Sequence, residues 1–274
     1  MIRRMIPERF RPIGYLTQLA RLRTGCTVKQ GPFAGMRYVQ VSQGSAYIPK
    51  LLGIYERELT PQVEILIARQ PRLIVDVGAA EGYYAVGLAR RLPGACVIAF
   101  EMEPRGQTAL REMATLNGVA DRVDVRAKCE PADLIAAIGS ETSVVMVCDV
   151  EGYEEKLLDP VAVPALKGAA ILVELHDFLV PGITETLQQR FAATHHIQHV
   201  WQEPRSRAEF PWRTLGTMLL PSSYLDWAVS EWRPVRMTWL WMVPKSANGP
   251  LGGASVPASL VNHLGFAVET NGNR

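Results

Sequence analysis

Residues 73–84 read Leu-Ile-Val-Asp-Val-Gly-Ala-Ala-Glu-Gly-Tyr-Tyr and are the most informative segment of the chain. Its first five residues are apolar except Asp76, a pattern typical of a strand buried on both faces. Gly78 then permits a tight turn, and Gly82 lets a ligand or a strand approach the start of a following helix closely. The free backbone N–H groups of that helix start indicate a ligand-binding turn.

Outward from this stretch, apolar runs alternate with helical patterns. A helix over residues 104–117 begins with a proline and ends before Gly118, and another is expected over 59–69. Further strands are predicted at 96–100, 123–127, 144–148, 169–175, 196–201 and 238–243. This alternation predicts an α/β fold, in which a mostly parallel sheet carries helices on both faces.

Composition excludes several classes of protein. Of 274 residues, 48% are hydrophobic and 20% charged, which excludes a chain that is disordered throughout. No uncharged apolar run reaches the ~18 residues of a membrane-spanning helix. The formal charge of +2 is too balanced to indicate a nucleic-acid binder by itself.

The cysteines and the first residues indicate the cellular compartment of the protein. Cys26, Cys96, Cys129 and Cys148 are widely spaced and form no C-x-x-C motif, so we expect a reducing cytoplasm. The basic start lacks the apolar stretch of a secretion signal. Six arginines among apolar residues over 2–23 suit either a terminal helix lying on its own domain or a helix at a membrane surface.

Charge around the glycine turn selects its ligand. The spacing is G-x-x-x-G rather than the G-x-G-x-x-G of dinucleotide sites, and Asp76 and Glu81 would repel a pyrophosphate. The same acids suit S-adenosylmethionine, which carries an ammonium and a sulfonium and no pyrophosphate. The second strand ends in Glu101, where an acid hydrogen-bonds the ribose in dinucleotide-type folds. Solvation of Glu101, or capping of the next helix, is the alternative.

These residues, together with Cys-Asp-Val-Glu-Gly-Tyr-Glu at 148–154, resemble the class I SAM-dependent methyltransferases of the FkbM type. The resemblance covers roughly residues 55–174. It implies a Rossmann-like, seven-stranded, mostly parallel sheet whose last strand is antiparallel. Lys128-Cys129-Glu130 stands where the family usually places a polar or acidic contact to adenine. The cofactor contacts that it implies are Asp76, Gly78, Ala79, Glu81, Gly82, Tyr83, Tyr84, Glu101, Met102, Cys129 and Asp149.

Acids and one imidazole follow the fourth and fifth strands, at the mouth of such a sheet. Catalysis is assigned to His176 as general base, with Asp177 or Glu151 orienting it, and to Asp149. A metal-assisted route remains open, in which Asp149, Glu174 or Asp177, and His176 bind Mg²⁺. Imidazole suits Mg²⁺ poorly, which favours base catalysis. Glu154 is expected to serve the dipole of a helix start, and His195 and His196 to lie at the surface or at a strand edge.

Three regions are expected along the chain. Residues 1–60 form an N-terminal helical extension or cap, 61–245 form the SAM-binding domain with a cap insertion at about 203–237, and 246–274 form a flexible tail. All six tryptophans lie between Trp201 and Trp241. With nearby arginines they could hold a sugar, a planar acceptor, an anionic group or stacked bases, or they could only pack the cap on the sheet.

The leading functional prediction is a SAM-dependent O-methyltransferase that acts on a small molecule, such as a sugar or a secondary metabolite. One alternative is a non-catalytic SAM-binding or regulatory protein on the same fold. Another is an RNA ribose methyltransferase, although nucleic acid is the less expected partner because no N/D-P-P-Y/F signature follows the fourth strand. A nicotinamide enzyme is the most distant alternative.

Overall fold

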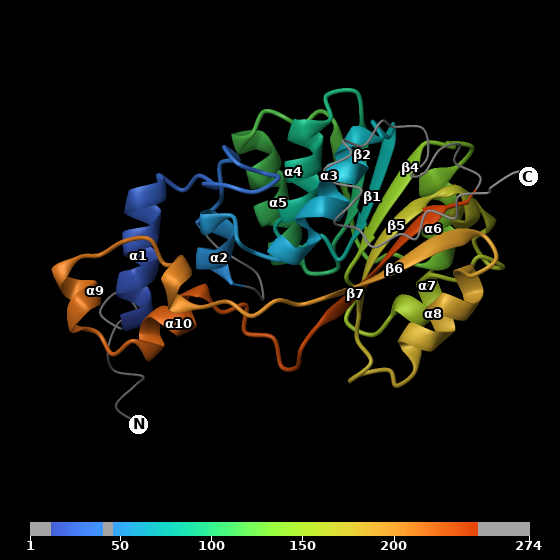
Figure 1. The fold of residues 1–274 in the computed structure, drawn as a ribbon. Coiled ribbons are helices and arrows are strands. Elements are labelled where there is room, and N and C mark those ends of the chain that lie inside the picture. Colours follow the sequence, from blue (N-terminus) through green and yellow to red (C-terminus); the bar gives the residue numbers. More distant parts are fainter. Residues whose placement is uncertain (1–11, 41–45, 246–274) are drawn as a thin grey trace, which may run out of the picture.

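The computed structural model describes residues 12–40 and 46–245. Seven strands form one sheet in the order β3-β2-β1-β4-β5-β7-β6 (Figure 1). The predicted tail and the first eleven residues lie outside the described residues. The strands are β1 Leu73–Val77, β2 Cys96–Phe100, β3 Val123–Arg126, β4 Val144–Cys148, β5 Ala170–Leu175, β6 His195–Trp201 and β7 Thr238–Pro244.

The directions of the strands confirm the predicted sheet. β1 pairs in parallel with β2 and β4, β2 pairs with β3, and β4 with β5. β7, the last strand in the sequence, runs antiparallel to both β5 and β6 and lies between them. The five parallel strands therefore end at one edge of the sheet, which is where α/β folds place their ligands.

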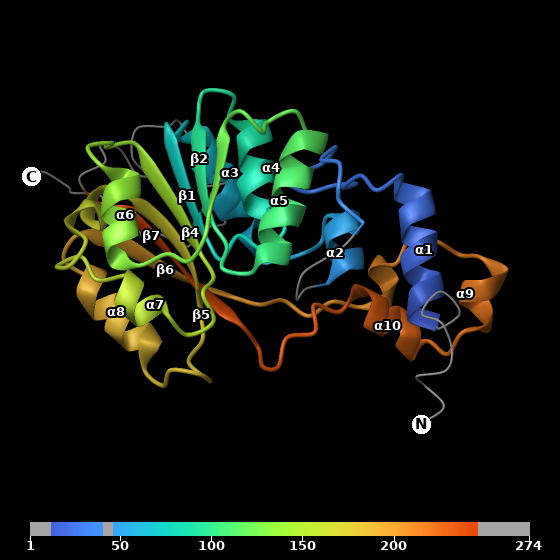
Figure 2. The same ribbon diagram turned by 180° about the vertical axis from the view of Figure 1, so that it is seen from behind.

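Two layers of helices cover the sheet (Figures 1 and 2). One face packs on α3 Thr60–Ala68, α4 Tyr83–Arg91 and α5 Pro104–Leu116, and the other on α6 Pro131–Ile138, α7 Glu154–Leu157 and α8 Ile183–Phe191. Strand β1 shows why its sequence is almost wholly apolar. Ile74 packs in the core on the α3, α4 and α5 face, and its neighbours Leu73 and Val75 pack in the core on the opposite face. Both faces of β1 are buried, so Asp76 stands out.

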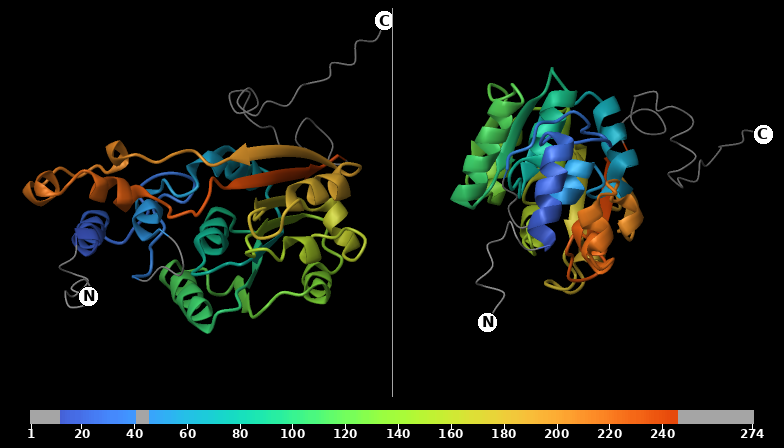
Figure 3. Two further views of the ribbon diagram at one scale, coloured as in Figure 1. Left: turned by 90° about the horizontal axis from the view of Figure 1, so that it is seen from below. Right: turned by 90° about the vertical axis from the view of Figure 1, so that its left-hand side faces the viewer.

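A helical lobe lies beside the sheet and draws on two distant parts of the chain (Figure 3). The 3-10 turn η4 Pro164–Gly168 is not part of this lobe and packs with the sheet. The two parts of the lobe pack together: α10 contacts α1 and α2, and the Tyr15 hydroxyl lies 3.0 Å from the Thr214 hydroxyl. The lobe comprises α1 Pro12–Thr24, α2 Tyr47–Leu52, η3 Arg57–Leu59, η5 Arg207–Glu209, α9 Leu215–Leu219 and α10 Ser223–Val229.

His195 differs from its expected place. Its side chain is buried, and its Nε2 lies 2.9 Å from the carbonyl oxygen of Ala169. Burial lowers the pKa of His195, so its ring packs as a neutral core group. His196, by contrast, is exposed as expected. The surface placement was wrong for His195, although β6, which begins at this residue, is an edge strand of the sheet. The ring turns inward toward Phe191 and the start of β5.

Within residues 12–40 and 46–245, no helix is both long enough and apolar enough to cross a membrane.

Candidate functional site

A cavity of about 940 Å³ opens at the carboxyl ends of β1, β2, β4 and β5. At one end it is walled by the turn after β1 and by Glu101. At the other end it is walled by His176 and by the segment that leads from α10 to β7. Sequence-predicted residues on the wall are Asp76, Gly78, Ala79, Tyr83, Tyr84, Glu101, Met102, Cys129, Asp149, Glu151, Glu174 and His176.

Gly78 makes the first turn possible. Its φ is +84°, and a Cβ at this position would lie 1.7 Å from the carbonyl oxygen of Asp149. The turns after β1 and β4 therefore meet backbone to backbone, which no side chain would allow. Gly82 is required for a different reason from the one predicted. Its φ is +93°, and a Cβ there would press on Leu110 of α5 at 3.0 Å.

Asp76 carries an unsatisfied carboxylate oxygen on the cavity wall. The residue is 3% exposed, and its Oδ2 is buried without a hydrogen-bond partner. Burial raises its pKa to about 7, opposed by a hydrogen bond from the backbone of Ala85. An orphaned buried acceptor is costly, so this atom fits a donor supplied by a ligand.

Glu81 lies apart from the cavity. Its carboxylate is buried and accepts hydrogen bonds from the Tyr38 hydroxyl at 2.6 Å and from Lys50 Nζ at 2.7 Å. Neither Glu81 nor Gly82 lines the cavity. The acidic character that the sequence assigned to both flanks of the turn is therefore carried toward the cavity by Asp76 alone, because Lys50 balances Glu81.

Glu101 is positioned by backbone donors at the end of β2. Its Oε2 accepts from the N–H of Ala80 and its Oε1 from the N–H of Glu103, both at 2.7 Å. Gly106 leaves room for it, since a Cβ there would lie 2.7 Å from the Glu101 Cγ. Each oxygen retains a further lone pair, so the carboxylate can still accept from two adjacent hydroxyls.

The aromatic residues of the α4 start form one wall. Tyr83 is buried edge-on to Tyr55, with ring centroids 5.2 Å apart, and Tyr84 donates to Glu56. On the other wall Cys129 is buried, and burial raises its pKa to about 12. Cys129 is therefore a neutral thiol. Met102 is 65% exposed at the rim.

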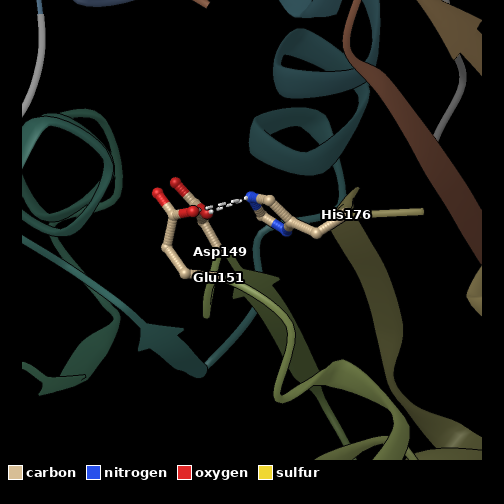
Figure 4. A group of neighbouring side chains, drawn as sticks. All are labelled: Asp149, Glu151 and His176. Carbon is tan, nitrogen blue, oxygen red and sulfur yellow. Dashed lines mark ion pairs between the residues drawn. The ribbon is translucent and has the colours of Figure 1, made fainter. Parts of the chain in front are cut away.

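His176, after β5, is the centre of the second end of the cavity (Figure 4). Its Nδ1 lies 2.5 Å from Oε1 of the buried Glu154, so the ring donates through Nδ1. Its Nε2 lies 3.4 Å from Glu151 Oε2 and 3.6 Å from Asp149 Oδ1. Burial lowers the pKa of His176, but the hydrogen bond with Glu154 and the charges of these carboxylates raise it above its usual value.

The Nδ1 partner differs from the predicted orienting residues. Asp177 instead accepts from the backbone N–H and the hydroxyl of Thr184 at the start of α8, and it does not line the cavity. Glu151 faces Nε2, the opposite side of the ring. Glu154, expected to serve only the helix start, is the residue that fixes the ring. The sequence signal for this role was that Glu154 follows closely after the carboxyl end of β4, where functional residues gather.

Asp149 and Glu151 converge on the same nitrogen. Asp149 Oδ1 is buried without a hydrogen-bond partner, whereas the Glu151 side chain is 76% exposed. Burial raises the pKa of Asp149 to about 6, which His176 opposes. One ligand atom from each of Asp149, Glu151 and His176 lies within 4.8 Å of the others, so these atoms could share a divalent cation.

Glu174 is held mainly by an arginine, although its Oε1 also lies 3.8 Å from Nε2 of His176. It is buried at the end of β5 and forms an ion pair with Arg233, which also pairs with Glu56. Burial raises the pKa of Glu174 well above its usual range, and the nearby Asp149 raises it further. The Mg²⁺ set drawn from the sequence used Glu174 or Asp177, whereas the ligand atoms that the structure brings within 4.8 Å of one another belong to Asp149, Glu151 and His176.

The lobe contributes residues that no motif indicated. Arg233 and Glu231 come from the segment before β7, and Glu56 from the turn before η3, which has a left-handed φ of +46°. Arg205 is also internal, pairing with Glu58 and with Glu231 at 2.6 Å. The signals in the sequence were the density of arginine and tryptophan between 201 and 241 and, for Glu56, its place just before the first helix of the sheet domain.

Comparison with known proteins gives partial likenesses. No family model matches the chain. It is similar to the ribosomal RNA small subunit methyltransferase G of Prochlorococcus marinus strain MIT 9303, with 33% identity over 78 residues, 28% of this chain and 32% of that protein. The strain MIT 9313 protein of the same name is 37% identical over 67 residues, 24% of this chain and 27% of that protein. The chain thus spans about a third of these curated relatives or less.

Two of the solved structures that resemble this chain at low identity are O-methyltransferases. An O-methyltransferase from Bacillus cereus in complex with SAH is 16% identical, covering 70% of this chain and 84% of that one, with a TM-score of 0.44. An O-methyltransferase from Streptomyces achromogenes in complex with SAM is 15% identical, covering 84% and 88%, also with a TM-score of 0.44.

Proposed function

We propose that this protein is a SAM-dependent methyltransferase that transfers a methyl group to a hydroxyl of a small molecule. The observation that carries the proposal is the single cavity that joins the β1 turn to His176. Asp76 and Glu101 stand at one end, and a base fixed by Glu154 stands at the other. The proposed cofactor site and the proposed proton acceptor thus lie in one cavity.

The residues at the first end fit the cofactor. Asp76 offers an unpartnered buried oxygen to an ammonium, and Glu101 offers two oxygens to the ribose hydroxyls. Met102 and Cys129 lie where the adenine would reach, between the ends of β2 and β3. When bound, S-adenosylmethionine supplies a methyl group on a positively charged sulfur, which needs no further activation.

The residues at the second end supply the proton transfer. The bound cofactor would supply the methyl group, and Nε2 of His176 would accept the proton of the acceptor hydroxyl as its oxygen takes that methyl. Glu154 holds Nδ1–H, so Nε2 is the basic nitrogen and faces the cavity. Alignment and this proton transfer are the work left to the protein.

The test is a pair of measurements. Calorimetry should detect binding of SAM and of S-adenosylhomocysteine, and methyl-labelled SAM incubated with a host extract should yield one labelled product by mass spectrometry. Binding of SAM without any product would favour the alternative of a non-catalytic SAM-binding protein. Absence of SAM binding, with tight NADH binding instead, would overturn the assignment.

A divalent cation is a second candidate for activating the hydroxyl, favoured by the convergence of Asp149, Glu151 and His176. It would lower the hydroxyl pKa in place of a base. The set contains an imidazole nitrogen and two carboxylates, which suits a transition metal better than Mg²⁺. Loss of turnover with a chelator, and recovery with one added metal, would identify this route.

An RNA acceptor is the alternative that the ribosomal RNA methyltransferase likeness favours. Against it stands the wall of the cavity, which carries more carboxylates than cationic side chains. Such a wall repels phosphates. Labelled SAM with total RNA as acceptor would decide, because tritium retained on RNA would support it.

A further inference from the structure

The cationic side chains of the cavity are already neutralised. Lys50 pairs with Glu81, Lys128 with Glu130 at 2.6 Å, and Arg233 with Glu56 and Glu174. These are the lysines and arginines of the described chain that line the cavity. An anionic group on the acceptor would therefore have to break an existing ion pair.

The carboxylates of the cavity are in excess. Glu231 is paired with Arg205, and Glu101 is satisfied by two backbone N–H groups. Asp149 and Glu151 have no lysine or arginine partner in the described chain, and the cation nearest to them is His176. The buried Oδ1 of Asp149 makes no hydrogen bond at all.

His176 can balance these two carboxylates only while it is protonated. In the proposed reaction it must be neutral to accept the hydroxyl proton. Among the described residues, the cation that then remains near Asp149 is Arg233, which is already paired with Glu56 and Glu174. A cation on the acceptor would add positive charge beside the two carboxylates.

Aromatic rings on the wall of the same cavity suit an organic cation. The indole of Trp232 lines the cavity with 53% of its surface exposed, and Trp227 supports it at a centroid distance of 5.0 Å. Rings of this kind already hold cations here, since Lys50 lies 4.8 Å from the Tyr55 ring and Arg233 5.8 Å from that of Trp239. Acids combined with an open indole are typical of sites for ammonium groups.

We propose that the acceptor is an organic cation, a hydroxylated amine whose positive charge is held by Asp149 and Glu151 beside the Trp232 ring. The inference rests on the proposed function, because it names the class of acceptor for that reaction. It replaces an anionic or phosphate-bearing acceptor with a positively charged one, while the methyl group still goes to the hydroxyl.

The test compares choline with its neutral isostere, 3,3-dimethylbutan-1-ol. The two probes differ in charge but hardly in shape. Calorimetry on protein saturated with S-adenosylhomocysteine, with EDTA present, should show choline binding about tenfold more tightly or better. Equal binding of the two probes, no binding of choline at tens of millimolar, or preference for an anion such as 3-hydroxypropanoate would overturn the inference.

Variants locate the effect. Glu151→Gln, on an exposed side chain that does not support the fold, should reduce the preference for choline several-fold, and Asp149→Asn should reduce it further. Glu103→Gln, an exposed lining carboxylate at the cofactor end, should leave it unchanged. An unchanged preference in Glu151→Gln and Asp149→Asn alike would overturn the placement.

Two further measurements separate the causes of failure. MnCl₂ alone, titrated by calorimetry, asks whether the same residues hold a metal. If Mn²⁺ binds tightly, displaces choline and no longer binds in Glu151→Gln, the site holds a metal ion and not an organic cation. Failure of S-adenosylhomocysteine to bind would refute the proposed function. The comparison of choline with its isostere on the ligand-free protein would still report the charge preference.

Discussion

The Nδ1 atom of His176 lies 2.5 Å from Oε1 of Glu154, a carboxylate with no exposed surface. The pair joins the loop after β5 to the first residue of α7. It fixes which nitrogen of the ring carries the proton and leaves Nε2 directed at the cavity (Figure 4). The identity of the base and its protonation state thus depend on one residue outside the cavity.

Glu154→Gln should move the pH dependence of turnover. Glu154 is among the groups that raise the pKa of His176, so its neutral replacement should lower that pKa. The base is active when neutral, so the acidic limb of the profile should shift to lower pH, and kcat should fall because the ring is less firmly held. The exposed neighbour Glu155→Gln is the matched control. A kcat that falls with no shift of the limb would indicate that Glu154 has only a structural role.

His176→Ala should reduce turnover by ~10²–10⁴, the range that general-base catalysis contributes. Calorimetry should show SAM bound with nearly normal affinity, because Asp76 and Glu101 lie at the other end of the cavity. His196→Ala, the same change on an exposed histidine, should leave both quantities unchanged. Near-normal turnover in His176→Ala would remove the base assignment.

Asp76 should make SAM binding depend on pH. Burial raises its pKa to about 7 in the free protein, so the carboxylate is largely neutral below that pH and ionised above it. Because the ionised form holds the ammonium, affinity should increase from roughly pH 6 to roughly pH 8. Asp76→Asn should weaken binding by about tenfold at the upper end and flatten this dependence.

The control for that titration is Asp124→Asn, on an exposed aspartate of β3 that pairs with Arg126 at the surface. Its profile should follow the wild type. An unaltered slope in Asp76→Asn would show that the titrating group lies elsewhere.

Gly78→Ala should destabilise the protein and abolish SAM binding. The added Cβ would meet the carbonyl oxygen of Asp149 at 1.7 Å, so the turns after β1 and β4 would have to separate. Gly118→Ala is the matched control, since its φ of +67° is similarly left-handed but nothing lies within 4 Å. It should cost only the backbone strain of about 1–2 kcal/mol. Thermal unfolding and calorimetry measure both effects, and equal losses in the two variants would contradict the close approach.

Lys50→Met should lower the free energy of unfolding by about 3–5 kcal/mol, because it leaves Glu81 buried and charged. The double variant Lys50→Met, Glu81→Leu should recover much of this loss, since it removes both charges. Chemical denaturation checks the cycle. A double variant no more stable than Lys50→Met would show that the two residues act independently.

Local patterns in the chain were enough to predict the sheet and the turn after β1. Strands β1, β2 and β4 begin and end where their apolar runs do, because a strand buried on both faces must be apolar along its length. Glycine at position 78 and an acid at position 101 are local signals of the same kind, and the structure places both on the cavity wall.

Only the folded chain shows which groups the charged side chains contact. Glu81 turns to Lys50 and Asp177 to Thr184, while Glu154 reaches His176 and Arg233 reaches Glu56 and Glu174. A charged side chain is placed by whichever opposite charge or donor the fold brings within reach. That choice involves residues as far apart in the chain as Glu56 and Arg233, so no local pattern records it.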